Sequence, residues 1–298
     1  MAGVIALGEC MVELSLTGPA SAGVGYAGDT FNTAVYLSRL GVSTAYATAV
    51  GQGDPFSEGI LDLMAQEGLG SALVVEAPGR LPGLYAIQRD ARGERSFFYW
   101  RDQAPARDYL ALADLEALGA AMAGTRLVYV SAITLAILGE AGRATLTPLL
   151  RAASQAGAAV ALDTNYRARL WPSAEAAEAA IEALSGSCRW ISLSAADVAD
   201  ADGAAARWAR GGAEVVLRRE DRRIELRSAD ASHVFDAGPD VAVVDTTGAG
   251  DAFNAGFLAA RLAGAEPAAA IAAGRRLAEV VVRHKGAIIP RTAMPEGA

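Results

Sequence analysis

Residues 243–253 read V-V-D-T-T-G-A-G-D-A-F, and this stretch decides how the rest of the chain is interpreted. Two β-branched apolar residues predict the end of a buried strand, the small residues predict a tight turn, and Phe253 begins the apolar spacing of a helix. In such a turn the amides of Gly248, Ala249 and Gly250 point at one spot, at the positive end of the helix dipole. The stretch therefore predicts an anion-binding turn between a strand and a helix.

Asp251 lies at the mouth of this turn, where a carboxylate would repel a bound anion. Its position makes chemical sense if it accepts a proton from an attacking hydroxyl while the turn holds the charge of a transferring phosphoryl group. The alternative is a glycine-rich turn in which Asp251 only caps the helix. The strand–turn–helix context and the rest of the chain favour the catalytic interpretation.

Bulk composition narrows the class of protein. Of the 298 residues, 52% are hydrophobic and 20% charged, which allows a large core and excludes a disordered chain. A net charge of −8 argues against a nucleic-acid partner, which requires a basic surface. The chain shows no basic leader segment and no apolar run near the ~18 residues of a membrane span, so a cytoplasmic protein without membrane contact is expected. The two Cys and two His have no metal-ligand spacing, and no protein metal site is predicted.

Strand-like and helix-like apolar runs alternate along most of the chain. This pattern predicts an α/β fold in three layers, with a mainly parallel central sheet covered by helices on both faces. The predicted strands are residues 4–7, 44–50, 127–131, 158–162, 190–193 and 215–217, and the predicted helices are residues 30–40, 56–67, 139–155, 175–184, 204–210, 251–262 and 267–283.

Two segments interrupt this alternation. Residues 84–88 and 96–100 read as two strands around a polar turn, which predicts a hairpin, and residues 11–16 alternate like a half-exposed strand. We expect these pieces to form a small β lid, discontinuous in sequence at about 10–17 and 80–102, over the carboxyl ends of the main sheet. The whole of 1–298 is then expected to be a single domain.

Residues 23–28 match G-x-G-x-x-G, the pattern of dinucleotide-binding turns. The match is weak because no strand leads directly into the first glycine and the next strand ends without an acidic residue. A better interpretation is a turn that enters a helix at Gly28, with Asp29 and Asn32 placed to bind a polyhydroxylated substrate. The alternative is a simple helix cap by Asp29.

Tyr85, Tyr99 and Arg101 lie on the predicted lid, and Tyr99 and Arg101 face the same side of their strand. Phenol hydroxyls and a guanidinium suit a substrate with hydroxyls and a carboxylate, since arginine binds carboxylates through two parallel hydrogen bonds. The alternative is ordinary aromatic packing on an exposed strand.

Arg167 follows the predicted strand 158–162 and is a second candidate for a substrate carboxylate or phosphate, the alternative being a surface ion pair. The mixed charge run at 218–223 is typical of a solvated turn. Its position after a late strand would equally suit contact with nucleotide phosphates.

Together these motifs resemble the ribokinase-like (PfkB) sugar kinases, whose C-terminal signature is similar to D-T-T-G-A-G-D at 245–251. Within that family the chain is most similar to the 2-keto-3-deoxygluconate kinases, and the resemblance covers nearly the whole chain. The supporting stretches are G-E-C-M-V-E-L (8–14), A-G-D-T-F-N-T-A (27–34), L-P-G-L-Y (81–85), G-E-R-S-F-F-Y-W-R (93–101), N-Y-R-A-R-L-W (165–171) and K-G-A-I-I-P-R-T-A-M-P (285–295).

The resemblance implies a ribokinase-like αβα sandwich whose lid helps to form a homo-oligomer. It implies ATP with Mg²⁺ as cofactors and a small sugar acid as the molecule phosphorylated. Asp251 would be the base, and the amides of Gly248, Ala249 and Gly250 would form the anion hole. The resemblance assigns Gly28, Asn32, Tyr85, Tyr99, Arg101 and Arg167, with Asp251, to the sugar acid, and Asn165, Ser194 and Arg218, with Gly248 and Gly250, to the nucleotide.

Two departures from the family pattern carry expectations of their own. Ala27 stands where the family usually has a glycine, which predicts a slightly shifted substrate pocket. Arg218-Arg219-Glu220 lacks the glycine usual after the basic residue, which predicts a strained or reshaped loop if positive φ is needed there. The alternatives are another kinase of the same fold, acting on fructose, ribose or 2-keto-3-deoxygalactonate, or a sugar-acid-binding protein with weak catalysis.

Overall fold

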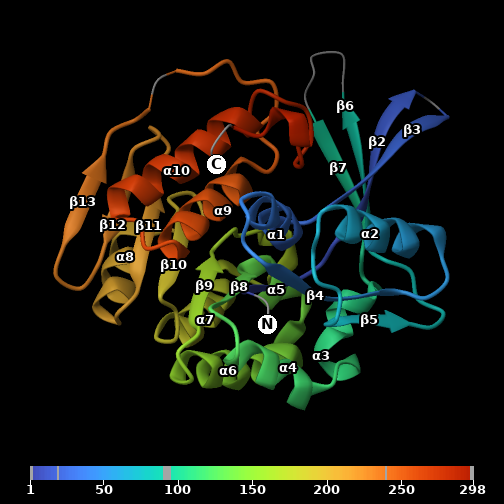
Figure 1. Ribbon diagram of the computed structural model, residues 1–298, viewed down its shortest axis with the longest axis horizontal. Coiled ribbons are helices and arrows are strands. Elements are labelled where there is room, and N and C mark those ends of the chain that lie inside the picture. Colours follow the sequence, from blue (N-terminus) through green and yellow to red (C-terminus); the bar gives the residue numbers. More distant parts are fainter. Residues whose placement is uncertain (1–2, 19, 90–94, 239, 296–298) are drawn as a thin grey trace.

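The computed structural model describes residues 3–18, 20–89, 95–238 and 240–295, and its described strands form two sheets (Figure 1). The larger sheet has nine strands in the order β13-β12-β11-β10-β9-β8-β1-β4-β5. All neighbouring pairs from β11 to β5 are parallel, whereas β12 and β13 are antiparallel additions. The bounds are β1 (Val4–Leu7), β4 (Thr44–Gly51), β5 (Val74–Ala77), β8 (Leu127–Ser131), β9 (Ala159–Asp163), β10 (Trp190–Ser194), β11 (Glu214–Arg218), β12 (Ile224–Arg227) and β13 (Ser232–Phe235).

Helices cover both faces of this sheet, because alternate residues of each buried strand point to opposite sides. In β1, for example, Ile5 and Leu7 pack into one core, and Val4 and Ala6 into the other. The first core holds α3 (Tyr109–Leu112), α4 (Leu115–Ala123), α5 (Ala132–Ile137), α6 (Gly139–Gln155), α7 (Ala174–Ser185) and α8 (Ala201–Arg210). The second holds α1 (Asp29–Arg39), α2 (Pro55–Gln66), α9 (Ala249–Leu262) and α10 (Pro267–Val281).

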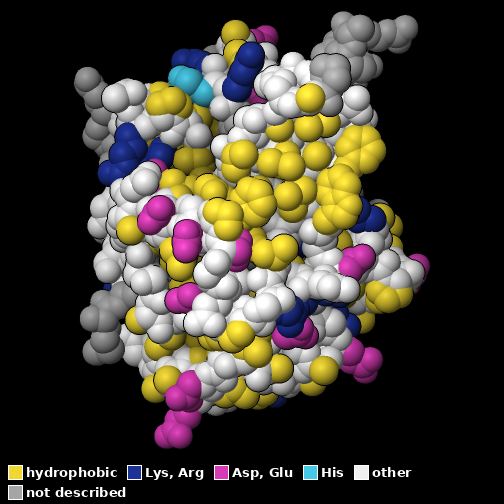
Figure 2. Space-filling model, turned by 90° about the vertical axis from the view of Figure 1, so that its right-hand side faces the viewer, with side chains coloured by type: hydrophobic (Ala, Val, Ile, Leu, Met, Phe, Trp, Pro, Cys, Tyr) yellow, Lys and Arg dark blue, Asp and Glu magenta, His cyan; other side chains and the backbone are white. Residues whose placement is uncertain are grey.

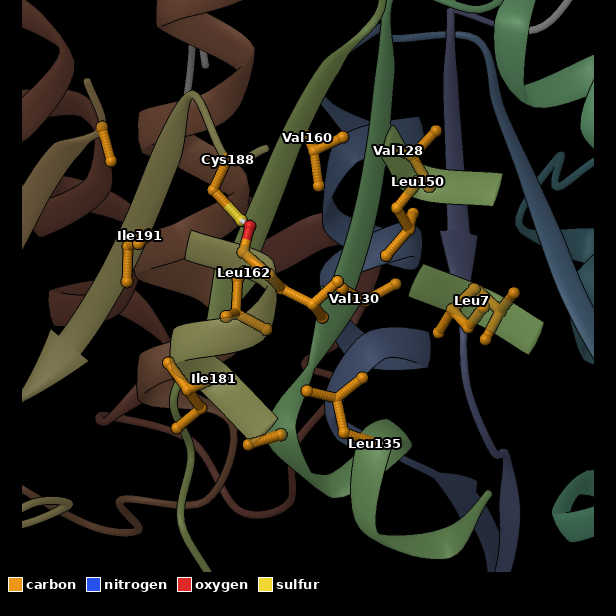
Figure 3. Close-up of a cluster of buried hydrophobic side chains, with 14 of the residues drawn as sticks. Leu7, Val128, Val130, Leu135, Leu150, Val160, Leu162, Ile181, Cys188 and Ile191 are labelled. Carbon is orange, nitrogen blue, oxygen red and sulfur yellow. Dashed lines mark hydrogen bonds between the residues drawn. The ribbon is translucent and has the colours of Figure 1, made fainter. Parts of the chain in front are cut away.

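The predicted three-layer, mainly parallel architecture is confirmed. Figure 3 shows part of the first core, where Val130 and Leu162 of neighbouring strands meet Ile181 of α7 and Leu135 of α5. Short 3₁₀ turns lie at Pro105–Asp108, Ala168–Leu170 and Arg291–Ala293. Among the described helices, none has both the length and the apolar character needed to cross a membrane.

The smaller sheet, which we call the lid, has the order β3-β2-β6-β7, formed by β2 (Met11–Gly18), β3 (Ser21–Ala27), β6 (Leu84–Arg89) and β7 (Arg95–Trp100). The predicted antiparallel pairing of β6 and β7 is confirmed, whereas the polar turn predicted between them lies outside the described residues. Strand β2 pairs parallel to β6. Strand β3 was not predicted. Gly23 and Gly25 flank Val24 and hide the alternation of apolar and polar residues that marks a strand. Because β3 extends to Ala27, the turn into α1 is confined to the residues around Gly28.

The expectation of a buried strand at 243–244 is wrong. Val243 and Val244 are 58% and 53% exposed, and the amide of Val244 donates to the carbonyl of Val282 at the end of α10 (2.7 Å). The edge of β11, where such a strand would pair, is occupied by β12. The chain therefore crosses the end of α10 as an irregular segment before α9 begins.

Candidate active site

A cavity of about 680 Å³ lies where the carboxyl ends of the large sheet, the lid and the N-terminus of α9 meet. Most of the residues predicted for a site line it, although they come from distant parts of the chain. The predicted residues in its wall are Gly28, Asn32, Tyr85, Tyr99, Arg101, Asn165, Arg167, Arg218, Gly248, Gly250 and Asp251. Its wall also includes residues to which the sequence assigned no role, among them Glu9, Met11, Arg95, Phe97, Asp163 and Arg169.

Asp251 belongs to the first turn of α9 and is only 8% exposed. Its Oδ2 accepts a hydrogen bond from Nδ2 of Asn32 on α1 (2.7 Å), and Oδ1 of Asn32 in turn accepts from the amide of Gly28 (3.4 Å). Burial, reinforced by the charge of Asp29, holds the pKa of Asp251 well above its ordinary value, and the Asn32 hydrogen bond opposes that rise only in part. A carboxylate with a raised pKa is a suitable proton acceptor from an alcohol.

Gly248 forms the turn that precedes Asp251, with φ of +76°, and is the N-cap of α9. A β-carbon at this position would lie 2.6 Å from the carbonyl oxygen of Ala287, so both the conformation and the space require glycine. The amide of Ala249 donates to the carbonyl of Thr246 (3.2 Å) and stabilises the turn itself. Of the three predicted anion-binding residues, Gly248 and Gly250 line the cavity and Ala249 faces the adjoining one.

Asp245 holds this turn from behind. Its carboxylate accepts hydrogen bonds from the amide and the hydroxyl of Thr247 (2.9 and 2.6 Å) and from the amide of Gly286 (3.2 Å). Although burial acts to raise its pKa, these hydrogen bonds and that of Arg95 bring the pKa of Asp245 down to about 2. Asp245 is thus ionised at neutral pH and serves the turn as a structural acceptor.

Arg218 ends β11 beside the same turn, and its Nη1 would lie 3.0 Å from a β-carbon at Gly250. Its Nη2 donates to Oδ1 of Asp163 at the end of β9 (3.3 Å). Burial raises the pKa of Asp163 to about 6, and the nearby positive charge of Arg218 opposes this shift without cancelling it. The guanidinium therefore stands where an anion held by the turn would meet it.

Two residues predicted to lie near the nucleotide, Asn165 and Ser194, have different surroundings: one bonds to α1, and the other is outside the cavity wall. Nδ2 of Asn165 donates to the carboxylate of Asp29 in the first turn of α1 (3.0 Å), which connects it with the Asn32 side of the cavity. Ser194 ends β10 opposite Arg218 in the sheet, but it is not part of the cavity wall. A role for Ser194 remains a prediction.

The inner face of the lid closes the cavity with aromatic rings. Tyr85 and Tyr99 are cross-strand neighbours whose rings stack with centroids 5.6 Å apart, and the hydroxyl of Tyr85 donates to Glu13. The guanidinium carbon of Arg169 lies 3.2 Å from the centre of the Tyr99 ring, a cation–π contact. Arg167 is exposed on the same segment and donates to the carbonyl of Tyr166 (2.9 Å).

Arg101 is buried and paired within the protein, which the sequence did not predict. Its side chain is only 5% exposed and is paired with the carboxylate of Glu9, which is 2% exposed. Burial raises the pKa of Glu9, and the charge of Arg101 counteracts that rise. Glu9 thus already offsets the positive charge of Arg101. Of the arginines in the cavity wall, Arg167 and Arg169 are the ones exposed to solvent.

A second cavity of about 350 Å³ adjoins the first and shares Arg218, Thr246 and Gly250 with it. Its wall includes apolar side chains from the irregular segment before α9 and from α10 and its C-cap, namely Val241, Val243, Ala278 and Val282. An apolar slot next to an anion-binding turn suits a flat ring that carries phosphates.

The charge run at 218–223 forms the turn between β11 and β12. Arg222 has φ of +65° and is the one non-glycine residue with positive φ in the described part of the chain. The backbone strain expected at Arg218–Glu220 is thus located two residues past Glu220, and Arg218 keeps its place beside the anion-binding turn.

A buried carboxylate beside a helix N-terminus, next to an adjoining cavity with apolar side chains, is an arrangement that suits phosphoryl transfer to an alcohol. The pfkB family carbohydrate kinase model matches residues 1–294, and the chain belongs to that family. It is 38% identical to the 2-dehydro-3-deoxygluconokinase of Dickeya dadantii, with 97% of each chain covered.

Solved structures show the same fold. The 2-dehydro-3-deoxygluconokinase of Thermotoga maritima superposes with a TM-score of 0.83 at 20% identity, covering 97% of this chain and 96% of that one. A putative ribokinase II of E. coli in complex with ATP and Mg²⁺ gives a TM-score of 0.84 at 19% identity, covering 97% and 95%.

Proposed function

We propose that this chain catalyses the ATP-dependent phosphorylation of 2-keto-3-deoxygluconate at its terminal hydroxyl, giving 2-keto-3-deoxy-6-phosphogluconate. The observation that carries the reaction type is the buried carboxylate of Asp251 beside the turn at Gly248. The name of the Dickeya relative and the cavity arginines support a sugar acid as the acceptor. ("2-Dehydro-3-deoxygluconate" is the same compound.)

In this proposal the sugar acid lies between the lid and α1. Tyr85 and Tyr99 cover it, Asn32 and Gly28 border it, and Arg167 and Arg169 attract its carboxylate. The terminal hydroxyl points at Asp251, which accepts its proton as the hydroxyl oxygen bonds to the γ-phosphorus of ATP and the bond from that phosphorus to ADP breaks. Asn32 keeps the carboxylate oriented through the 2.7 Å hydrogen bond, so positioning supplies a large part of the rate.

ATP would extend from the turn into the second cavity. Gly248, Gly250 and Arg218 fit the terminal phosphates, because amide dipoles and a guanidinium stabilise charge on the transferred group. The apolar slot at Val243 and Val282 fits the base. In this arrangement the terminal phosphate of ATP, held at Gly248 and Gly250, faces the carboxylate of Asp251.

Mg²⁺ would enter with the nucleotide and supply positive charge to its phosphate oxygens. Among the described residues there is no cluster of three or more His, Cys, Asp or Glu side chains that could hold a metal ion. Such a site fits a magnesium ion that keeps several waters and is bound chiefly by phosphates. The acidic wall at Asp29 and Asp163 provides suitable surroundings.

The test is an ADP-release assay with ATP and Mg²⁺ on matched acceptors: 2-keto-3-deoxygluconate, 2-keto-3-deoxygalactonate, fructose and ribose. We expect the highest kcat/KM for 2-keto-3-deoxygluconate and a loss of at least about tenfold for the neutral sugars, whose lack of a carboxylate leaves Arg167 and Arg169 unpaired. Fructose or ribose as the best acceptor would contradict the proposal. So would calorimetric binding of the sugar acid without any ADP release.

We further propose that two copies of this chain pair through the outer faces of their lids. The strand register places Leu14 and Val24 opposite each other on that face, as it does Ala86 and Phe98. Phe98 and Trp100 are 46% and 62% exposed, and Figure 2 shows a broad apolar patch on this side of the molecule. A broad exposed apolar face suits pairing with itself about a twofold axis.

Trp100→Lys should convert the dimer to a monomer in analytical ultracentrifugation, because the charge would be buried in the apolar interface. The control is Leu115→Lys on α4, an exposed apolar residue away from the lid (37% exposed), which should leave the sedimentation coefficient unchanged. A wild-type monomer at micromolar concentration would refute the pairing.

A further inference from the structure

Arg95 connects the lid to the anion-binding turn. It is the first residue of β7, and its Nη1 donates to Oδ1 of Asp245 and to Oγ1 of Thr247, both at 2.5 Å. The two segments are 150 residues apart in sequence. The side chain of Arg95 is 21% exposed and that of Asp245 only 2%, so the pair lies largely out of water.

Asp245 links this contact to the turn before α9. The same Oδ1 atom that accepts from Arg95 also accepts from the amide and the hydroxyl of Thr247, directly before Gly248. Because the carboxylate is ionised at neutral pH, the bond from Arg95 is charge-assisted and stronger than one between neutral groups. A movement of Arg95 therefore reaches the turn through one shared oxygen atom.

The same strand, β7, carries part of the lid's contribution to the cavity wall. Phe97 and Tyr99 follow Arg95 at intervals of two, so all three side chains point to the inner face and line the cavity. Arg95 thus joins the element that covers the acceptor to the element that holds the phosphoryl group.

We propose that Arg95 is a positioning residue that holds the lid and the anion-binding turn in a fixed position relative to each other. It acts through Asp245 and Thr247, and its effect on turnover rests on the proposed function. Loss of the contact lets the turn shift relative to the acceptor hydroxyl, and misplacement by about 1 Å costs on the order of 10²-fold in rate.

The experiment is a double-mutant cycle with Arg95→Gln and Thr247→Val. We expect Arg95→Gln to lower kcat roughly 10–100-fold, while the calorimetric Kd for the sugar acid changes much less. The double variant should be little worse than Arg95→Gln alone, because both changes disrupt one connection. The control Arg80→Gln removes an ion pair to Asp108 (3.0 Å) outside the cavity and should leave kcat unchanged.

Hydrogen exchange gives a second measurement that does not depend on turnover. The amides of residues 245–250 should exchange faster in Arg95→Gln than in the wild type, and Arg80→Gln should leave them unchanged. Unchanged exchange in Arg95→Gln, or kinetic effects that simply add in the double variant, would overturn the proposal. A wild type that phosphorylates no sugar refutes the proposed function, whereas the exchange result still decides the role of Arg95 in the turn.

Discussion

Asp251→Asn is expected to lower kcat by roughly 10²–10⁴-fold, the range for loss of a positioned general base. The amide cannot accept the proton of the acceptor hydroxyl, although its oxygen can still take the hydrogen bond from Asn32 that Asp251 accepts at 2.7 Å. The KM for the sugar acid should change modestly, because the side chain keeps its size and its neighbour. Steady-state ADP release at saturating ATP measures both parameters.

The matched control is Asp62→Asn, the same chemical change at an exposed position on α2 that does not line the cavity. It should keep wild-type kcat. Thermal unfolding separates lost chemistry from lost structure: removal of a buried carboxylate whose pKa is raised should leave Tm the same or higher. An Asp251→Asn enzyme with near-normal kcat would exclude this residue as the base.

Arg101→Ala should lower the free energy of unfolding by about 3–5 kcal/mol at pH 8, the usual cost of leaving one member of a buried ion pair unpaired. The partner left behind is Glu9, whose carboxyl is almost completely inaccessible to water. Urea unfolding monitored by circular dichroism measures the difference. The same change should also reduce activity, because Arg101 lines the cavity.

The loss should depend on pH in a defined direction. Burial already raises the pKa of Glu9 above its ordinary value of 4.5, and Arg101 is the largest opposing influence. Without Arg101 the folded-state pKa rises further above the unfolded one. The carboxyl of Glu9 then costs no stability below its unfolded-state pKa, and the cost grows as pH rises through the folded-state pKa. The loss of stability in Arg101→Ala should therefore shrink on acidification toward pH 5.

Glu9→Gln provides the control for this interpretation. Added to Arg101→Ala, it removes the buried charge and should recover part of the lost stability at pH 8 but little at pH 5. Arg80→Ala, which breaks a more exposed ion pair with Asp108, should have a far smaller effect. A defect of equal size at pH 5 and pH 8 would show that lost packing, and not the unpaired carboxylate, is responsible.

The sequence alone identified those parts of the site that local chemistry determines. The turn before α9, the cavity position of Asp251 and the antiparallel pairing of β6 and β7 each carry a short sequence pattern with a physical cause, and the cavity brings Asp251 together with Asn32. The layered fold was predictable for the same reason, since alternating strand and helix patterns leave few other arrangements.

Long-range partners could not be predicted in this way. Nothing near Glu9 or Arg95 in the sequence indicates that they pair with Arg101 and Asp245, because those contacts exist only after the lid has folded onto the sheet. Strand β3 was not predicted because its glycines weaken the alternating pattern of a strand. The strand predicted at 243–244 was wrong because β-branched residues also occur in exposed irregular segments.

The lid is assembled from two separate excursions of the chain. One, β2 and β3, leaves between β1 and α1, and the other, β6 and β7, leaves between β5 and α3. Among the described strands, the two excursions are joined by the parallel pairing of β2 with β6, so neither excursion forms the whole lid. Anyone who wishes to graft this lid onto a related scaffold must transplant both insertions together. The aromatic rings of the cavity wall belong to β6 and β7, but the hydroxyl of Tyr85 donates to Glu13 of β2, and either insertion alone would leave one strand edge unpaired.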